Sequence, residues 1–168
     1  MIKVRRANID DAYKIAQINV NTWNEAYKGL LPDSLLKKRT VSEERVLGIV
    51  NKIKEPDFIF LVSEYNNEVV GFCSGGLARD ENYPFKYELR ALYVLPQFQT
   101  KGIGKALINE FKKKINNNPF YLYALKSNIN AHNFYKKMGG TELAQYEKLI
   151  SKDDLKIEEV LFAFNLEQ

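Results

Sequence analysis

A glycine-containing turn is the stretch of this sequence whose residue types point most directly to chemistry. Residues 87–95 are rich in aromatic and branched apolar residues and end at Pro96, which is typical of a buried strand that terminates there. Gly102 and Gly104 follow, and from Ile103 onward apolar residues recur every fourth position, which predicts a helix. A glycine turn that opens into a helix offers unpaired backbone N–H groups and the positive end of the helix dipole. The stretch therefore predicts a phosphate-binding turn.

Two common phosphate-binding patterns do not fit this turn. A nucleotide P-loop needs a glycine where Gln99 stands and a serine or threonine where Ala106 stands. A dinucleotide fingerprint needs a third glycine where Leu107 stands. The pattern that remains, Gln-x-x-Gly-x-Gly after a strand, resembles the acyl-CoA pyrophosphate loop of the GCN5-related N-acetyltransferases (the GNAT family). A purely structural glycine turn is the alternative for this stretch alone.

A second motif later in the chain strengthens the resemblance. Residues 128–139 read Asn-Ile-Asn-Ala-His-Asn-Phe-Tyr-Lys-Lys-Met-Gly, which is similar to the later GNAT signature of an asparagine, a Phe-Tyr pair and a glycine that follows the helix. The two motifs cover residues 87–107 and 128–140, in the order that the family has. One departure is Gly140, where the family usually has an aromatic residue, and we expect it to affect packing more than chemistry.

The resemblance implies the fold and the reaction. The fold expected is an α/β fold with a mixed central β-sheet of about seven strands flanked by helices, in a single N-acetyltransferase domain over residues 1–168. The reaction expected is transfer of an acetyl group from acetyl-CoA to a primary amine, by direct attack in a ternary complex. The acceptor expected is a small molecule of polyamine or amino-sugar type, with no metal ion, and a homodimer is considered as the assembly.

The resemblance also assigns catalytic candidates. Tyr135 would be the general acid, with its hydroxyl near the sulfur of CoA; the alternative is an aromatic side chain that only packs on a helix face. Glu88 would be the general base, directly or through water, and its alternative is an exposed strand glutamate without a role. Some family members carry the acidic residue two positions later, where this chain has Arg90, on the same side of the strand. The lone histidine, His132, is interpreted as a surface helix residue.

The cofactor would be held by the strand, the glycine turn and the last motif. The residues expected to bind it are Leu92, Tyr93, Val94, Gln99, Thr100, Lys101, Gly102, Ile103, Gly104, Lys105, Asn128 and Asn133. On the acceptor side, residues 23–32 resemble a segment that covers the substrate cleft in part of the family. Trp23, Glu25 and Tyr27 are the residues there that could line an amine pocket, because aromatic faces and carboxylates both favour ammonium groups. Trp23 as a core residue and Glu25 as a solvated one is the alternative; Asp80 and Glu81 are weaker candidates.

Alternating strands and helices must position these residues. The expected strands are residues 2–6, 58–64, 68–78, 87–95, 120–125, 141–150 and 157–166, with a charged turn around residues 152–154. Helices are expected after Asn8, at residues 33–34, after Thr40, after Gly104 and after Asn128. Thr40 and Glu43 have the spacing of a capping box, and the glycines at 75 and 76 indicate a bulge or a close backbone approach.

Composition narrows the class of protein. The single cysteine, Cys73, excludes an internal disulfide framework and suits a buried position in a reducing compartment, and one cysteine with one histidine argues against a structural zinc site. The N-terminus is not a secretion signal, and no apolar stretch approaches the ~20 residues of a membrane span. A cytoplasmic protein that binds no membrane is therefore expected. The net charge of +4 is mild and spread along the chain, so no nucleic-acid partner is expected.

Three other functions stay open at this point. The acceptor could be a peptide or protein amine, in which case only the substrate differs. The chain could be a non-catalytic sensor that binds acyl-CoA, which would bind the cofactor without releasing a thiol. A nucleic-acid-binding protein is the remaining alternative, and steep salt dependence of binding would distinguish it.

Overall fold

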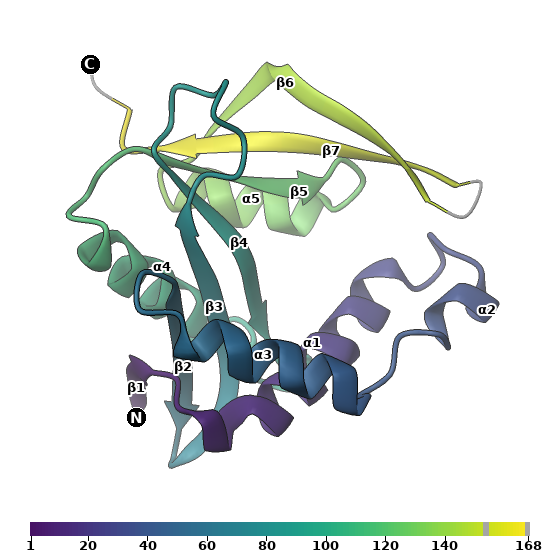
Figure 1. Cartoon of the computed structure of the whole chain (residues 1–168). Helices are drawn as coiled ribbons and strands as arrows, with labels where there is room; N and C mark the ends of the chain where they lie inside the picture. Colours follow the sequence, from purple (N-terminus) through teal and green to yellow (C-terminus); the bar gives the residue numbers. More distant parts are fainter. Residues whose placement is uncertain (153–154, 167–168) are drawn as a thin grey trace. The chain divides into compact units, whose positions relative to one another are not determined.

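The strands follow the expected mixed pattern. The computed structural model describes residues 1–152 and 155–166. Seven strands form one hydrogen-bonded sheet in the order β1-β2-β3-β4-β5-β7-β6, with helices beside it, so the predicted α/β fold is confirmed (Figure 1). The chain divides into two compact units, residues 1–75 with 91–114, and residues 76–90 with 115–168. We call them unit 1 and unit 2. The single domain expected over the whole chain stays a prediction.

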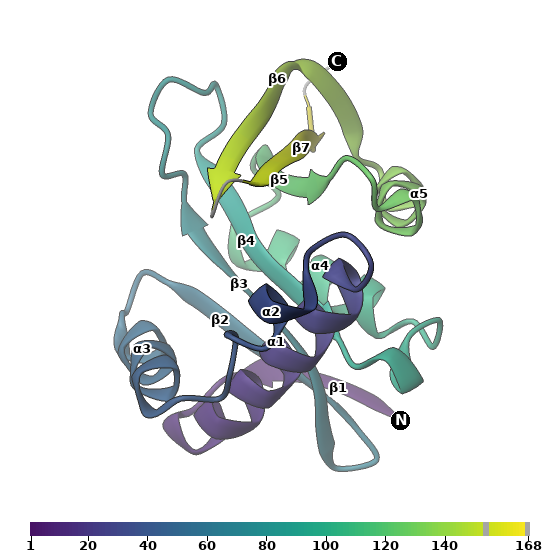
Figure 2. The same cartoon turned by 90° about the vertical axis from the view of Figure 1, so that its right-hand side faces the viewer.

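Unit 1 holds the N-terminal helices and the glycine turn. Its elements are β1 (Ile2–Arg6), a 3-10 turn (Ile9–Asp11), α1 (Ala12–Tyr27), α2 (Asp33–Leu36), α3 (Glu43–Lys54), β2 (Ile59–Tyr65), most of β3 (Glu68–Leu77), the second half of β4 (Tyr87–Val94), a 3-10 turn (Pro96–Phe98) and α4 (Ile103–Lys114). Antiparallel pairing of β1, β2 and β3 gives this unit its sheet. Figure 2 shows α3 and α4 on opposite sides of β2 and β3.

The two faces of the unit 1 sheet differ in what covers them. Leu61 and Cys73 are register partners on β2 and β3, so they share one face. The Cys73 thiol lies 3.9 Å from the backbone oxygen of Leu107 on α4, which makes this the α4 face. Phe72 points to the other face, where its ring packs 5.5 Å from the ring of Tyr93 on β4. Cys73 is completely buried, as expected, and burial raises the pKa of its thiol.

Unit 2 is built on strands from the C-terminal half of the chain. Its elements are the end of β3, the first half of β4 and the segment that joins them. They are followed by β5 (Phe120–Leu125), α5 (Ile129–Lys137), β6 (Thr141–Lys152) and β7 (Leu155–Phe164). β5 runs parallel to β4, and β7 is antiparallel to both β5 and β6. Figure 1 shows α5 beside β5 and β7. The centre of the expected charged turn, Asp153 and Asp154, lies outside the described residues.

The two faces of the unit 2 sheet also differ. Phe162 and Phe164 on β7 meet the side chains of α5: the ring of Tyr135 lies 5.7 Å from that of Phe162 and 6.4 Å from that of Phe164. Tyr121 on β5 points to the opposite face, because its register partner Ala163 lies between those two phenylalanines. On that face the ring of Phe85, from the segment between β3 and β4, packs 5.7 Å from the ring of Tyr121.

Local packing explains why residue 140 is a glycine where the family usually has an aromatic residue. A Cβ atom at this position would lie 2.7 Å from Cζ of Phe164 and 2.9 Å from the backbone oxygen of Tyr135. The Phe164 ring therefore fills the space that a side chain at 140 would need. The departure concerns packing at the end of α5, as expected from the sequence.

One local expectation from the sequence is wrong. The cap of α3 is Ser42, whose hydroxyl accepts a hydrogen bond from the Arg45 backbone N–H at 3.1 Å, so the Thr40 capping box does not form. The pairing of β2 with β3 shifts register between Ser63 and Glu64. A close backbone approach occurs at Gly71, where a Cβ atom would meet the Ser63 hydroxyl at 2.8 Å and the Tyr93 backbone oxygen at 2.9 Å. The bulge or close approach expected at the glycines at 75 and 76 stays a prediction.

Candidate active site

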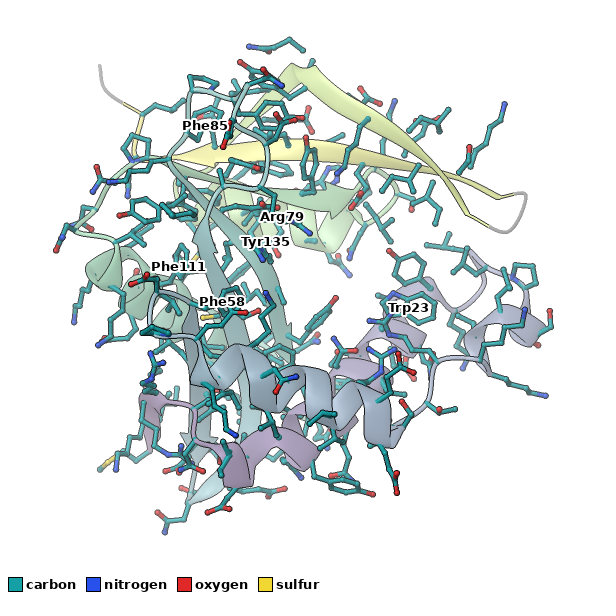
Figure 3. All side chains as sticks on the ribbon, in the orientation of Figure 1. Trp23, Phe58, Arg79, Phe85, Phe111 and Tyr135 are labelled. Carbon is teal, nitrogen blue, oxygen red and sulfur yellow. The ribbon has the colours of Figure 1, made fainter. Side chains whose placement is uncertain are left out.

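Glu88 is a buried carboxylate held by an arginine of unit 2. The residue is 3% exposed, and its two carboxylate oxygens accept hydrogen bonds from Nη2 of Arg79 at 2.5 Å and from Nε of Arg79 at 3.0 Å. The backbone N–H of Arg79 donates a third hydrogen bond at 3.2 Å, and Nε of Arg90 lies 4.0 Å away. Figure 3 labels Arg79, which follows the end of β3. The alternative of an exposed glutamate on this strand is therefore wrong.

The surroundings of Glu88 act on its pKa in opposite directions. Burial raises the pKa, since it disfavours the charged form. The hydrogen bonds and the positive charge of Arg79, with a further hydrogen bond from Tyr121, outweigh burial and leave the pKa below its ordinary value. Glu88 is consequently an ionised hydrogen-bond acceptor at neutral pH. Such a carboxylate can accept a hydrogen bond from an amine or a water, but it holds a proton only weakly.

A cluster of tyrosines lies on the same face of the unit 2 sheet as this carboxylate, with Tyr121 as the register partner of Glu88. Rings of Tyr83 and Tyr121 meet edge to face at 5.1 Å, and the hydroxyl of Tyr83 forms a short hydrogen bond with that of Tyr123. Burial raises the pKa of both Tyr121 and Tyr123, so these phenols stay protonated. Lys148 packs on this tyrosine cluster, with its ammonium nitrogen 3.9 Å from the centre of the Tyr123 ring.

Helix α5 carries the candidate acid on the opposite face of the unit 2 sheet. Asn128 caps α5 as predicted, because its side-chain oxygen accepts a hydrogen bond from the Ala131 backbone N–H at 3.1 Å. The half-buried ring of Tyr135 rests on Phe162 and Phe164, whereas Glu88 is the register partner of Tyr121 and lies with it on the other face. Tyr135 is labelled in Figure 3. The two candidate proton-transfer groups therefore approach the unit 2 sheet from opposite sides.

His132 is a structural residue of α5. It is 7% exposed rather than on the surface, so that expectation is wrong. Its Nε2 lies 2.8 Å from the backbone oxygen of Leu125, and its ring packs on Phe162. Asn133, one position later, is exposed. The helix is amphipathic over only nine residues, and the sequence pattern did not show which side its histidine takes.

The glycine turn of unit 1 has the geometry of an anion-binding turn. Gln99 donates a side-chain hydrogen bond to the Val94 backbone oxygen at 2.9 Å and so ties the turn to the end of β4. Thr100 and Gly102 have positive φ angles of 66° and 87°, which fold the chain sharply before α4. The first turn of α4 contains no acidic residue, and Lys101 and Lys105 are exposed beside it. Backbone N–H groups at this helix start lack intrahelical partners, so the turn fits a phosphate group.

The end of α1 in unit 1 brings together two of the three predicted acceptor residues. The rings of Trp23 and Tyr27 are stacked with centroids 4.5 Å apart, while Glu25 is exposed. Arg39, which the sequence did not single out, lies with its guanidinium carbon 4.5 Å from the centre of the Trp23 ring. Figure 3 labels Trp23. A cation of the protein itself thus occupies one face of this aromatic pair.

Sequence patterns missed two charged residues, Arg79 beside Glu88 in unit 2 and Arg39 beside Trp23 in unit 1. Both lie outside regular elements, in segments whose residue types indicate only a polar loop. Within residues 1–152 and 155–166, no three histidine, cysteine, aspartate or glutamate side chains group so as to hold a metal ion. In the same residues, no helix combines the length and apolar character that crossing a bilayer requires.

Comparison with known proteins gives the family. Residues 17–140 match the family model described as the acetyltransferase (GNAT) family. The chain is 30% identical over 108 residues to the uncharacterized N-acetyltransferase YuaI of Bacillus subtilis (strain 168), over 64% of this chain and 61% of that protein, so the match spans less than two thirds of the relative. It is 26% identical over 145 residues to the spermidine N(1)-acetyltransferase of Thermoplasma acidophilum, over 82% of this chain and 87% of that protein.

Solved structures agree on the fold. The crystal structure of the PaiA N-acetyltransferase from Thermoplasma acidophilum in complex with coenzyme A superposes with a TM-score of 0.70 at 24% sequence identity. The alignment covers 95% of this chain and 98% of that one. Because the family model matches most of the sequence, and because fold and relatives agree with it, this chain belongs to the GNAT family of N-acetyltransferases.

Proposed function

We propose that this protein transfers the acetyl group of acetyl-CoA to a primary amine of a small molecule, of polyamine or amino-sugar type, within a ternary complex. The observation that carries the proposal is the buried, ionised Glu88 on one face of the unit 2 sheet with Tyr135 on the other. A direct transfer needs a proton acceptor for the amine and a proton donor for the leaving thiolate. The ionised carboxylate of Glu88 is a group of the first kind, and the phenol of Tyr135 is a group of the second kind.

Binding of the cofactor is assigned to the glycine turn and to the adjoining strand. The pyrophosphate would lie against the backbone N–H groups of residues 102–105, with Gln99, Thr100 and Lys101 beside it, and the pantetheine arm would follow residues 92–94. Asn128 and Asn133 are proposed as further contacts. The coenzyme A complex of the Thermoplasma structure supports this cofactor, as does the family of the chain. The cofactor supplies an activated acetyl thioester.

Each proton step is assigned to a residue of the chain. Glu88 would accept a proton from the amine, directly or through a water, as the nitrogen attacks the carbonyl carbon, and would pass that proton to solvent. The new C–N bond forms and the C–S bond breaks, and the Tyr135 hydroxyl would give its proton to the sulfur and regain one from solvent. A backbone N–H of residues 92–94 would hold the carbonyl oxygen while it carries negative charge. Cys73 is not an acyl carrier in this scheme, because it is buried and its pKa is raised.

Free-thiol release from acetyl-CoA tests the proposed function. The purified protein would be mixed with acetyl-CoA and a panel of polyamines, amino sugars, amino acids and lysine peptides. We expect turnover with small amines, and the spermidine acetyltransferase relative makes polyamines the first compounds to try. Turnover with lysine peptides alone would show that the acceptor is a peptide amine and not a small molecule. Coenzyme A binding without thiol release in any mixture would contradict the enzyme and favour an acyl-CoA sensor.

A further inference from the structure

Two arginines of unit 1 converge on one neutral acceptor. Arg39 follows α2 and Arg45 lies in the first turn of α3. Nη2 and Nε of Arg39 donate to the side-chain oxygen of Asn19 on α1 at 3.0 Å and 3.3 Å, and Nη1 of Arg45 donates to the same oxygen at 3.2 Å. A single amide oxygen thus takes hydrogen bonds from two positive groups. Neither group gains a counter-charge from it.

Negative charge is missing from this cluster. In the part of the chain that the structure describes, neither guanidinium forms an ion pair with a carboxylate; Arg45 donates its other bond to the Thr40 backbone oxygen at 3.1 Å. The acidic residues Glu43 and Glu44 are near in sequence, but both are exposed. Burial, and then the positive charge of Arg45, lower the pKa of Arg39. Two half-buried guanidiniums side by side repel each other, and a bound anion would remove that cost.

The arginines sit next to the predicted acceptor residues. The guanidinium of Arg39 is stacked over the ring of Trp23, and that ring is itself stacked on Tyr27. These contacts fix the orientation of the Arg39 guanidinium. An oriented guanidinium loses little freedom when it binds a carboxylate or a phosphate through two parallel hydrogen bonds. The end of α1 therefore carries an oriented guanidinium that can receive an anion.

The anion that belongs here is not the cofactor pyrophosphate. Arg39 interacts electrostatically with Tyr93 of β4, whose ring packs on Phe72. Phe72 points away from the face on which Cys73 meets α4. The glycine turn opens into α4, so the pyrophosphate turn belongs with the opposite face of the unit 1 sheet. An anion on Arg39 would instead lie beside Tyr93, on the α1 and α3 face.

We infer that Arg39 and Arg45 bind an anionic group of the acceptor, so that the substrate is an amine that also carries a carboxylate or a phosphate. The inference rests on the proposed acetyl transfer and revises its acceptor from simple amines to amines that carry an anionic group. It favours amino acids and phosphorylated amino sugars over simple polyamines, which carry only positive charge. Arg39 and Tyr27 take the two faces of the Trp23 ring, so the outer side of the Tyr27 ring would pack on the body of the substrate.

Matched pairs of amines test the inference, because their members differ only in the anionic group. Lysine would be compared with cadaverine, and glucosamine 6-phosphate with glucosamine. We expect kcat/KM to be roughly ten- to a hundred-fold higher for the anionic member of at least one pair, the range of a charge-assisted hydrogen-bonded contact. The pair that responds distinguishes a carboxylate from a phosphate. Equal or higher activity with both non-anionic members would overturn the inference while the acetyltransferase itself stands.

Variants of the two arginines supply the control. In Arg39→Gln and Arg45→Gln the advantage of the anionic member should shrink about ten-fold through KM. Arg39→Lys should keep part of the advantage because the positive charge remains. The rest should be lost because lysine lacks the planar guanidinium that forms two parallel hydrogen bonds. Lys38→Gln removes a charge from the neighbouring exposed lysine and should change nothing. Unchanged selectivity in both glutamine variants would overturn the inference.

Measurements of amine binding test the anion receptor without requiring that the amine is acetylated. Titration calorimetry of the coenzyme A complex would measure glucosamine 6-phosphate and lysine against glucosamine and cadaverine. If no amine is acetylated, the proposed function fails, yet tighter binding of an anionic member that is lost in Arg39→Gln would still support the anion receptor. Equal binding within both pairs would contradict the anion receptor whatever the activity is.

Discussion

Replacing Tyr135 by phenylalanine is expected to lower kcat by roughly 10²- to 10³-fold, the contribution of a general acid, with little change in the affinity for coenzyme A. The substitution removes only the hydroxyl. The phenylalanine ring keeps the contacts that Tyr135 makes with Phe162 and Phe164, so α5 should remain packed. The thiolate of coenzyme A would then leave without a proton donor. Steady-state thiol release and equilibrium binding of coenzyme A measure the two quantities.

A second tyrosine provides the matched control for this variant. Tyr13 lies on α1 and is 58% exposed, so Tyr13→Phe removes a hydroxyl that has no assigned role. It should leave kcat and stability unchanged. A loss of less than two-fold in Tyr135→Phe would contradict the acid role. The aromatic packing of Tyr135 would then be its whole contribution.

The second large effect concerns the pair of Glu88 and Arg79. Arg79→Gln removes the charge and the side-chain hydrogen bonds that lower the pKa of Glu88, while burial, which raises it, remains. The pKa of Glu88 should therefore rise above its ordinary value. In the parent protein the acidic limb of the pH profile of kcat/KM should lie below the usual carboxylate range. In Arg79→Gln that limb should shift upward, and its midpoint reports the new pKa.

Folding stability should depend on pH in the same direction. A carboxyl whose pKa is lowered by folding stabilises the native state above its unfolded pKa of about 4.3 and loses that contribution as the pH falls through the folded value. In Arg79→Gln the contribution of Glu88 to stability depends on pH in the opposite direction, because the buried carboxylate then has no positive partner. We expect a loss of about 1–3 kcal/mol at pH 7, below the usual cost of breaking a buried pair because the Arg79 side chain is 61% exposed. The loss should be smaller at pH 4.

Chemical denaturation of four proteins completes this test. The parent, Arg79→Gln, Glu88→Gln and the double variant form a cycle. Glutamine at 88 is neutral, so the double variant should be more stable at pH 7 than Arg79→Gln alone. Activity should stay low in both variants that lack Glu88. Equal destabilisation by Arg79→Gln at pH 7 and pH 4 would mean that the ion pair does not set the charge state of Glu88.

Residue patterns predicted the elements that regular periodicity encodes. The strand, glycine turn and helix over residues 87–114 form as expected, and so does the Asn128 cap of α5. These features are local, because the spacing of apolar residues and the side chain of a cap act within a few positions. The same local logic failed at Thr40, where Ser42 lies closer to the helix start and takes the cap.

The charges of the site could not be predicted in the same way. Glu88 and Arg79 meet because strands β3 and β4 bring together residues nine positions apart, and no sequence pattern reports on that pairing. Arg39 reaches Trp23 from the segment after a short helix, and the spacing of residues in the sequence does not encode that contact. The burial of His132 likewise depends on Phe162 of a distant strand. Partners set by tertiary contacts decide how candidate residues behave.

The most direct test of the account follows isotopically labelled acetyl groups through a single turnover. Protein in excess over labelled acetyl-CoA would be mixed with an acceptor amine and stopped, and mass spectrometry would then examine both the acceptor and the protein. Direct transfer predicts that the label appears as an amide on the amine and that the protein carries none at any time. Label found on the protein before it reaches the amine would contradict direct attack, and label that stays on coenzyme A would contradict the acetyltransferase itself.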